Sequence, residues 1–236
     1  MKKRIWELDA LRGMNLFLMI AIHFIYDILY LFPLVRWQLP DWYDPMVRFC
    51  GSLFVLISGI CVTLGKRSVR RGLTVLGGGM IITAVTVALA WTGFCDKGII
   101  IYFGVLHCLG CCMLLWPLVK NCPGWALCLL GLVLILLGRY FDTLTLDTVW
   151  LVPFGIVPPG FVSSDYFPLV RHFGTFLCGA GAARYLYASK ESLLPHFPMV
   201  WPVRFLQWCG RSSLLIYLLH QPVLAAIAAL LFFTTH

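Results

Sequence analysis

The chain has 236 residues, of which 61% are hydrophobic and 12% are charged, and its mean hydropathy is +0.89. A soluble domain carries about 25% charged residues, so this composition excludes an ordinary soluble protein. The formal net charge is +8. We expect no nucleic-acid partner, because lysines and arginines also accumulate on the cytoplasmic side of membrane proteins.

The apolar residues form segments close to the ~20 residues that a helix needs to cross the core of a bilayer. These segments cover residues 13–33, 46–65, 72–92, 99–119, 124–140, 167–187 and 211–233. The pattern predicts an all-α polytopic membrane protein with a bundle of about seven transmembrane helices. We expect residues 1–236 to form a single integral-membrane domain.

The basic residues predict the orientation of the chain. Most lysines and arginines lie in segments that share a side of the membrane with the N-terminus, whereas acidic residues such as Asp96 and Asp147 lie on the other side. The positive-inside rule therefore places the N-terminus in the cytoplasm. An odd number of spans then places the C-terminus outside, in a multi-pass protein of the cell membrane.

The first span carries three ionisable residues on one helical face. Arg12 precedes His23 by eleven residues. At about 100° per residue the two side chains share a stripe and lie roughly 16 Å apart along the axis. Asp27 follows one turn after His23. Because charged groups are costly in a membrane, the set predicts a functional site in which Asp27 orients His23 as a general base. The alternative is a buried ion pair that only positions the helix.

Two further histidines lie near the middle of their predicted spans, His107 in the fourth and His220 in the last. Each is compatible with a pocket residue or with a neutral imidazole that is hydrogen-bonded inside the bundle. Arg211 precedes His220 by nine residues. On a continuous straight helix these two side chains would face opposite sides.

Five arginines lie at the predicted cytoplasmic edge: Arg12, Arg67, Arg70, Arg71 and Arg211. They either anchor the topology or line a vestibule for phosphate groups. A donor with a phosphorylated head at these arginines would need an arm of ~16 Å to reach His23. Acyl-CoA has this shape. His23 would then deprotonate an acceptor from the outer side, or carry the acyl group itself.

Several stretches together resemble a known family: LDALRG at residues 8–13, HFIYD at 23–27, YFGVLH at 102–107, SSDYFP at 163–168 and LLIYLLHQPV at 214–223. The set is similar to the bacterial members of the heparan-α-glucosaminide N-acetyltransferase catalytic-domain family, which are transmembrane acyltransferases. The resemblance implies transfer from acetyl-CoA to an amino sugar or glycan. It also implies a donor-binding Arg12 and a catalytic His23. Further pocket residues would be His107, His220, Ser163, Ser164, Asp165 and Tyr166.

Two other classes of protein fit parts of the pattern. A transporter or lipid flippase also uses intramembrane His and Asp residues, although the chain lacks internal repeats. A haem or quinone protein would use histidines from several helices. We expect the ten cysteines to be structural and no metal to be bound, and a homo-oligomer is compatible with the sequence.

Overall fold

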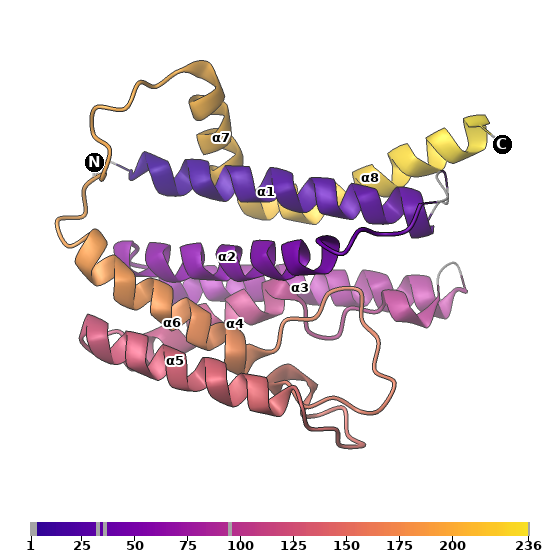
Figure 1. Ribbon diagram of the computed structural model, residues 1–236, viewed down its shortest axis with the longest axis horizontal. Helices are drawn as coiled ribbons and strands as arrows, with labels where there is room; N and C mark the ends of the chain where they lie inside the picture. The colour runs from indigo at the N-terminus through magenta and orange to yellow at the C-terminus, as the bar shows by residue number, and fades with distance from the viewer. Residues whose placement is uncertain (1–3, 32–33, 35–36, 94–95, 236) are drawn as a thin grey trace. The chain divides into compact units, whose positions relative to one another are not determined.

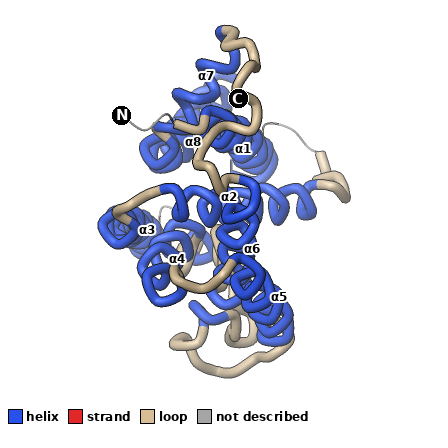
Figure 2. Tube along the Cα trace, turned by 90° about the vertical axis from the view of Figure 1, so that its left-hand side faces the viewer, coloured by secondary structure: helices blue, strands red, loops and turns tan. Residues whose placement is uncertain are grey.

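The computed structural model describes residues 4–31, 34, 37–93 and 96–235. Within these ranges all continuous elements are helical, which confirms the predicted all-α fold (Figures 1 and 2). The elements are α1 (Trp6–Tyr26), the π-helical turn η1 (Asp27–Leu31), α2 (Tyr43–Leu64), α3 (Ser68–Trp91), the 3-10 turn η2 (Lys97–Ile99), α4 (Val105–Val119), α5 (Gly124–Phe141), the 3-10 turn η3 (Val152–Phe154), α6 (Leu169–Leu186), α7 (Trp201–Arg211) and α8 (Ser213–Thr235).

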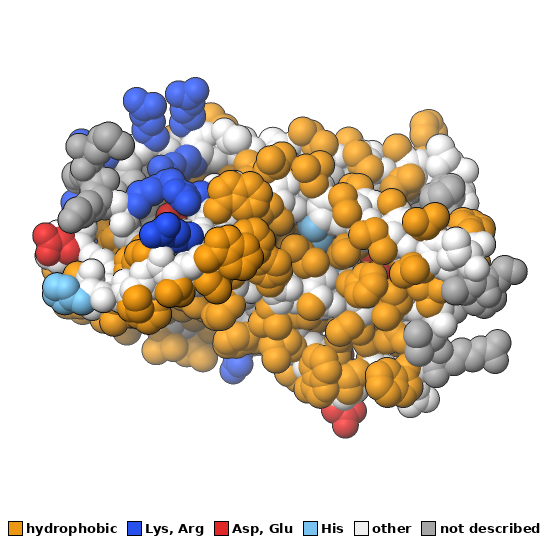
Figure 3. Space-filling model, turned by 90° about the horizontal axis from the view of Figure 1, so that it is seen from above, with side chains coloured by type: hydrophobic (Ala, Val, Ile, Leu, Met, Phe, Trp, Pro, Cys, Tyr) orange, Lys and Arg blue, Asp and Glu red, His pale blue; other side chains and the backbone are white. Residues whose placement is uncertain are grey.

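Helices lie at all seven positions predicted for membrane spans. Five segments are long and apolar enough to cross a bilayer: Trp6–Leu31, Tyr43–Leu64, Ser68–Trp91, Gly124–Phe141 and Ser213–Thr234. Helix α4 is apolar but shorter, and α6 carries Arg171, His172 and Arg184. Hydrophobic side chains cover most of the face drawn in Figure 3, as expected of a surface that contacts lipid.

The predicted boundaries are wrong at several places. The first span was expected to begin at residue 13, but α1 begins at Trp6. The fourth span was expected to begin at residue 99, but α4 begins at Val105. Residues 100–104, between η2 and α4, are not helical, and Thr83 and Thr86 hydrogen-bond to the backbone of Ile101 in this segment. The last span was expected to begin at Arg211, which instead ends the separate helix α7. Residues 32–33 of the first predicted span and His236 lie outside the described residues.

The chain divides into two compact units, which are described separately. The first unit contains residues 1–54 and 190–236, and the second contains residues 55–189. Helix α2 contributes its first half to the first unit and its second half to the second.

In the first unit, α1 packs against α7 and α8 (Figure 1). The approach to α7 is close because the two helices meet at glycines. A Cβ atom at Gly13 would collide with the carbonyl of Leu206, and one at Gly210 would collide with the carbonyl of Asp9. These two positions therefore require glycine for the helices to touch.

The beginning of α2 is tied to α1 by two buried polar contacts. The Asn15 amide donates to the carbonyl of Cys50 at 2.9 Å, and the Tyr43 hydroxyl donates to the carbonyl of Ile22 at 3.0 Å. Ile22, Tyr43 and Cys50 also form a hydrophobic cluster. The contacts satisfy polar groups that would otherwise be costly in an apolar environment.

In the second unit, α3 pairs with α4, and α5 pairs with α6. Cys128 of α5 and Cys178 of α6 pack reciprocally, each thiol lying 3.8–3.9 Å from the carbonyl of the other residue. Trp116 of α4 contacts Phe176 of α6 edge to face, and Phe176 is fully buried. The core of this unit therefore lies where α4 and α6 meet.

Candidate active site

The predicted polar stripe of the first helix ends at a change in helix type. Arg12 and His23 lie on α1, and Asp27 begins the π-helical turn η1. Arg12 lies near α7, with a guanidinium nitrogen 3.5 Å from the carbonyl of Gly210 and 4.0 Å from the carboxylate of Asp9. A π-helical turn within a helix is frequently associated with a functional site.

One ring nitrogen of His23 is engaged with the backbone of its own helix. Its Nδ1 lies 2.9 Å from the carbonyl oxygen of Met19. Since a carbonyl oxygen only accepts, Nδ1 carries the hydrogen, and Nε2 of the neutral ring keeps its lone pair. Within the described part of the chain, no hydrogen bond joins His23 to Asp27. The sequence predicted that Asp27 orients His23. In the structure the backbone carbonyl of Met19 makes the hydrogen bond that fixes the tautomer of His23.

The carboxylate of Asp27 is held from α8. The Gln221 side chain donates to both Asp27 carboxylate oxygens, at 2.9 and 3.1 Å. The Asp27 side chain has no exposed surface. Sequence reasoning missed Gln221, although it directly follows His220 within the LLIYLLHQPV stretch.

The structure brings His220 against His23. The two ring centroids are 4.9 Å apart, and the ring planes meet at 71°. Nδ1 of His220 lies 2.5 Å from the carbonyl oxygen of Tyr217, so it also carries the hydrogen. Nε2 of His220 is buried and has no hydrogen-bond partner among the described residues. This site therefore brings two imidazoles into contact, and in the neutral form of each ring Nε2 is the nitrogen without a hydrogen.

His107 belongs to the second unit and has both ring nitrogens engaged. The Gly104 amide donates to Nδ1 at 3.3 Å, and Nε2 lies 3.2 Å from the Thr83 hydroxyl. That hydroxyl donates its hydrogen to the carbonyl of Ile101 at 2.6 Å, so it accepts from Nε2 of His107. The ring joins α3 to the beginning of α4 and has no lone pair left for a proton.

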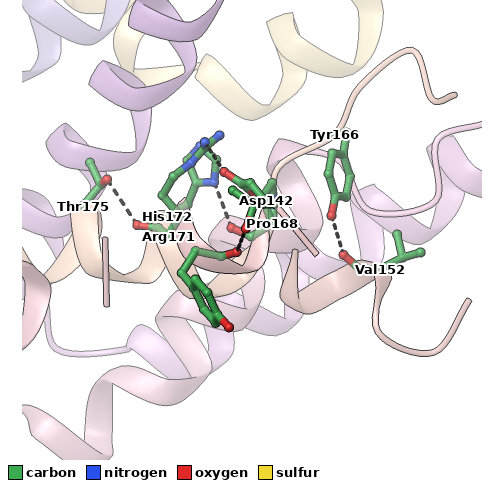
Figure 4. Close-up of polar contacts among 9 residues, drawn as sticks. Asp142, Val152, Tyr166, Pro168, Arg171, His172 and Thr175 are labelled. Carbon is green, nitrogen blue, oxygen red and sulfur yellow. Dashed lines mark hydrogen bonds and ion pairs between the residues drawn. The ribbon is translucent and has the colours of Figure 1, made fainter. Parts of the chain in front are cut away.

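The 163–166 segment, predicted to line the acceptor pocket, is hydrogen-bonded within the second unit. The two serine hydroxyls donate to the carbonyls of Ile100 and Gly98. An Asp165 carboxylate oxygen accepts from the Val105 amide at 3.0 Å, at the N-terminus of α4. The Tyr166 hydroxyl donates to the carbonyl of Val152 at 2.7 Å (Figure 4). Burial raises the pKa of this phenol, which keeps it protonated as a donor.

An ion pair lies near this segment. Arg171 of α6 contacts the Asp142 carboxylate at 2.6 Å, and Nδ1 of His172 lies 2.8 Å from the carbonyl of Pro168 (Figure 4). Burial raises the pKa of the Asp142 carboxyl, because the charges of Arg171 and Arg139 offset only part of the desolvation. The pair joins the end of α5 to the start of α6.

Residues 4–222 match the family model of the heparan-alpha-glucosaminide N-acetyltransferase catalytic domain. The chain belongs to this family. The match covers nearly the whole sequence and includes all the predicted site residues, from Arg12 to His220. No curated protein and no solved structure matches the chain significantly. Membership of the heparan-alpha-glucosaminide N-acetyltransferase family indicates a membrane transferase of the acetyltransferase kind.

This acetyltransferase-family chain has a basic pocket in its second unit. The pocket is open and has a volume of about 890 Å³. Its charged lining residues are Lys66, Arg67, Arg70 and Lys120, and Trp116 forms part of its wall. Arg71 is not among the lining residues, and Arg12 and Arg211 belong to the first unit. Two of the five predicted donor-binding arginines, Arg67 and Arg70, thus line one pocket together with two lysines.

Among the described residues, no group of three or more His, Cys, Asp or Glu side chains is placed to hold a metal ion. The prediction that this acetyltransferase-family protein works without a metal stays a prediction.

Proposed function

We propose that the chain transfers an acetyl or other short acyl group from cytoplasmic acyl-CoA to an amino sugar or glycan on the non-cytoplasmic side. Family membership supports acetyl transfer. The distribution of basic residues in the sequence supports the orientation. A donor that stays in the cytoplasm and an acceptor that stays outside would then meet at groups inside the membrane.

The observation that carries this proposal is the hydrogen bond between Nδ1 of His23 and the carbonyl of Met19. It leaves Nε2 as a base fixed in orientation. This nitrogen takes the proton of the acceptor amine or hydroxyl as that group attacks the thioester carbonyl. The CoA thiolate leaves and receives a proton. In an alternative two-step route, Nε2 attacks the thioester first and carries the acyl group.

Asp27 has an electrostatic role in this proposal. Asp27 lies one helical turn after His23, at the start of η1, and its side chain is shielded from solvent. A buried negative charge at this separation stabilises the imidazolium that forms when Nε2 accepts a proton. Gln221 keeps the carboxylate hydrogen-bonded throughout.

The donor phosphates would bind the arginines of the predicted cytoplasmic edge. Arg67 and Arg70 support this best, since they line one pocket together with Lys66 and Lys120. Guanidinium and ammonium groups hold phosphates through charge-assisted hydrogen bonds. Arg12, Arg71 and Arg211 are further donor-binding candidates. Acetyl-CoA thus acts as a co-substrate.

The acceptor would bind near His220, whose Nε2 is free for a hydrogen bond. His107 and the 163–166 segment remain candidates for the acceptor pocket. Both ring nitrogens of His107 are hydrogen-bonded inside the second unit, which supports a structural role for His107 rather than proton transfer with the acceptor.

The test uses the purified protein in lipid nanodiscs with acetyl-CoA and D-glucosamine as the probe acceptor. We expect release of CoA thiol that depends on the acceptor. In proteoliposomes, movement of substrate without thiol release would favour a transporter and contradict the proposal. A Soret absorption band in the purified protein would favour the haem alternative.

A further inference from the structure

We propose that His220 is a second catalytic base, which takes a proton from the protonated amino group of the acceptor while His23 takes the proton released during attack. This role rests on the proposed acyl transfer and goes beyond it, because it divides two proton transfers between two histidines.

The first observation is that one ring nitrogen of His220 has no hydrogen-bond partner in the described part of the chain. Its Nε2 is buried without a hydrogen-bond partner among the described residues. Buried polar atoms in folded proteins nearly always have a partner, so an exception calls for an explanation such as a catalytic role or a ligand. Nδ1 donates to the carbonyl of Tyr217, so in the neutral ring the unpartnered Nε2 carries a lone pair. A group that donates hydrogens would bond to it.

Gln221, the next residue along α8, also has a buried polar atom without a hydrogen-bond partner among the residues that the structure describes. The side-chain oxygen of Gln221 is also buried without a partner in the described part of the chain, while its nitrogen donates to Asp27. Two consecutive residues of α8 therefore each present an unused acceptor. An ammonium group has three hydrogens to donate, whereas a carbonyl or a carboxylate has none to offer to either acceptor.

Three ionisable groups lie around His220 and the adjacent Gln221. His23 of α1 contacts its ring at 4.9 Å between centroids. Asp27 of η1 lies against the adjacent Gln221, and Tyr217 of the same helix lies 5.2 Å from the His220 ring. The carboxylate is the only group among these three that is charged near neutral pH in its ordinary state. It favours a cation beside the two imidazoles.

The chemistry of an amine acceptor requires two proton transfers. Near neutral pH an aliphatic amino group is mostly protonated and has no lone pair for attack. In the proposed route Nε2 of His220 takes one ammonium proton and later passes it to solvent. The free amine attacks the thioester carbon, and the C–S bond breaks. Nε2 of His23 takes the second nitrogen proton and delivers it to the CoA thiolate. The products are the amide, CoA thiol and one proton.

The pair of imidazoles thus separates two proton transfers that one base would have to perform in succession.

A purely structural role for His220 predicts a different pH dependence of the rate. If His220 only packs against His23, its removal lowers the rate by the same factor at every pH. If it deprotonates the ammonium, its removal matters little at high pH, where solution already supplies the free amine.

The test compares wild type, His220→Asn and His23→Asn in nanodiscs, with acetyl-CoA and D-glucosamine at pH 6.5 and pH 9. For His220→Asn we expect a loss of about 100-fold at pH 6.5 and a rate within about threefold of wild type at pH 9. His23→Asn should be inactive at both values. A His220→Asn defect of equal size at both pH values would overturn the role of His220 and leave the acyl transfer intact.

A second measurement needs no variant. If the wild type binds the ammonium form, its KM for total glucosamine stays constant at pH values below the pKa of the sugar amine, where nearly all of the sugar is protonated. If it binds only the free amine, KM rises about tenfold for each unit of pH below the pKa of the sugar amine. The second result would overturn the proposal even if His220→Asn failed to fold. A wild type that releases no thiol would overturn the acyl transfer itself, and this role with it.

Discussion

Gln221 donates hydrogen bonds to both carboxylate oxygens of Asp27, at 2.9 and 3.1 Å, and so joins two residues that are 194 positions apart in the chain. The contact ties α8 to the end of α1 at the level where His220 meets His23. The arrangement of the two imidazoles therefore depends on a polar contact outside them.

Replacing Gln221 by Leu should destabilise the protein, because Asp27 would lose its hydrogen-bond donor while remaining buried. Hydrogen bonds to charged groups contribute about 1.5–3 kcal/mol, which corresponds to a decrease in Tm of about 3–12 °C for a chain of this size. Thermal unfolding in detergent measures the change. The double variant Asp27→Leu with Gln221→Leu should recover part of the loss, and an unchanged Tm in Gln221→Leu would contradict the contact.

Replacing Thr83 by Val should also lower the Tm, because the Thr83 hydroxyl bonds both to His107 and to the carbonyl of Ile101. Leaving a buried imidazole N–H without an acceptor costs about 1–3 kcal/mol. Thr74→Val is the matched control, since its hydroxyl is exposed and bonds only to the carbonyl of Arg70. Equal effects of the two variants on thermal unfolding would show that the His107 contact contributes nothing.

Replacing Arg67 or Arg70 by Gln should weaken binding of acetyl-CoA. Loss of one charge-assisted contact with phosphate, at about 1.5 kcal/mol, raises KM for the donor roughly tenfold with little change in kcat. Arg139→Gln serves as the control, because Arg139 is exposed in the last turn of α5 and does not line the pocket. Kinetics at varied acetyl-CoA concentration decide the matter. A KM equal to that of the control would remove the basic pocket from the donor site.

Replacing Gly210 by Ala should disrupt the packing of α1 against α7. The added methyl group would overlap the carbonyl of Asp9, and such overpacking costs about 1–3 kcal/mol. Gly77→Ala is the opposite case, since no atom lies within 4 Å of its added Cβ and the residue is inside α3. That variant should be neutral or more stable by about 0.5–1 kcal/mol. Thermal unfolding of the two proteins separates them, and a Gly210→Ala protein as stable as wild type would rule out the close approach.

The sequence predicted the helices well because apolar residues dominate each span. It placed helices at all seven positions, and the family assignment is confirmed by the match over residues 4–222. It missed α7 because Arg204 and Gln207 interrupt any apolar run there. It wrongly extended the fourth span over residues 99–104. The hydroxyl groups that bind this segment belong to Thr83 and Thr86 of α3, and the apolar pattern of the segment itself does not reveal such contacts.

The sequence predicted the relative arrangement of the site residues only along α1, although it also named His220 of α8 as a pocket residue. Helical periodicity identified Arg12, His23 and Asp27, but it could not show that a carbonyl of the same helix takes up Nδ1 of His23. The contacts of His220 with His23 and of Gln221 with Asp27 arise from packing between the first and last helices. Such tertiary contacts leave no periodic signal in the sequence. The membrane orientation and the acceptor stay predictions.

The most direct test of the central claim is acetyl transfer by His23→Ala. Wild type and variant are reconstituted in nanodiscs, and radiolabelled acetyl-CoA is followed into glucosamine while binding of acetyl-CoA is measured separately. We expect the variant to bind acetyl-CoA as wild type does and to transfer acetyl at least about 100-fold more slowly. Transfer at the wild-type rate would contradict the assignment of His23 as the catalytic base.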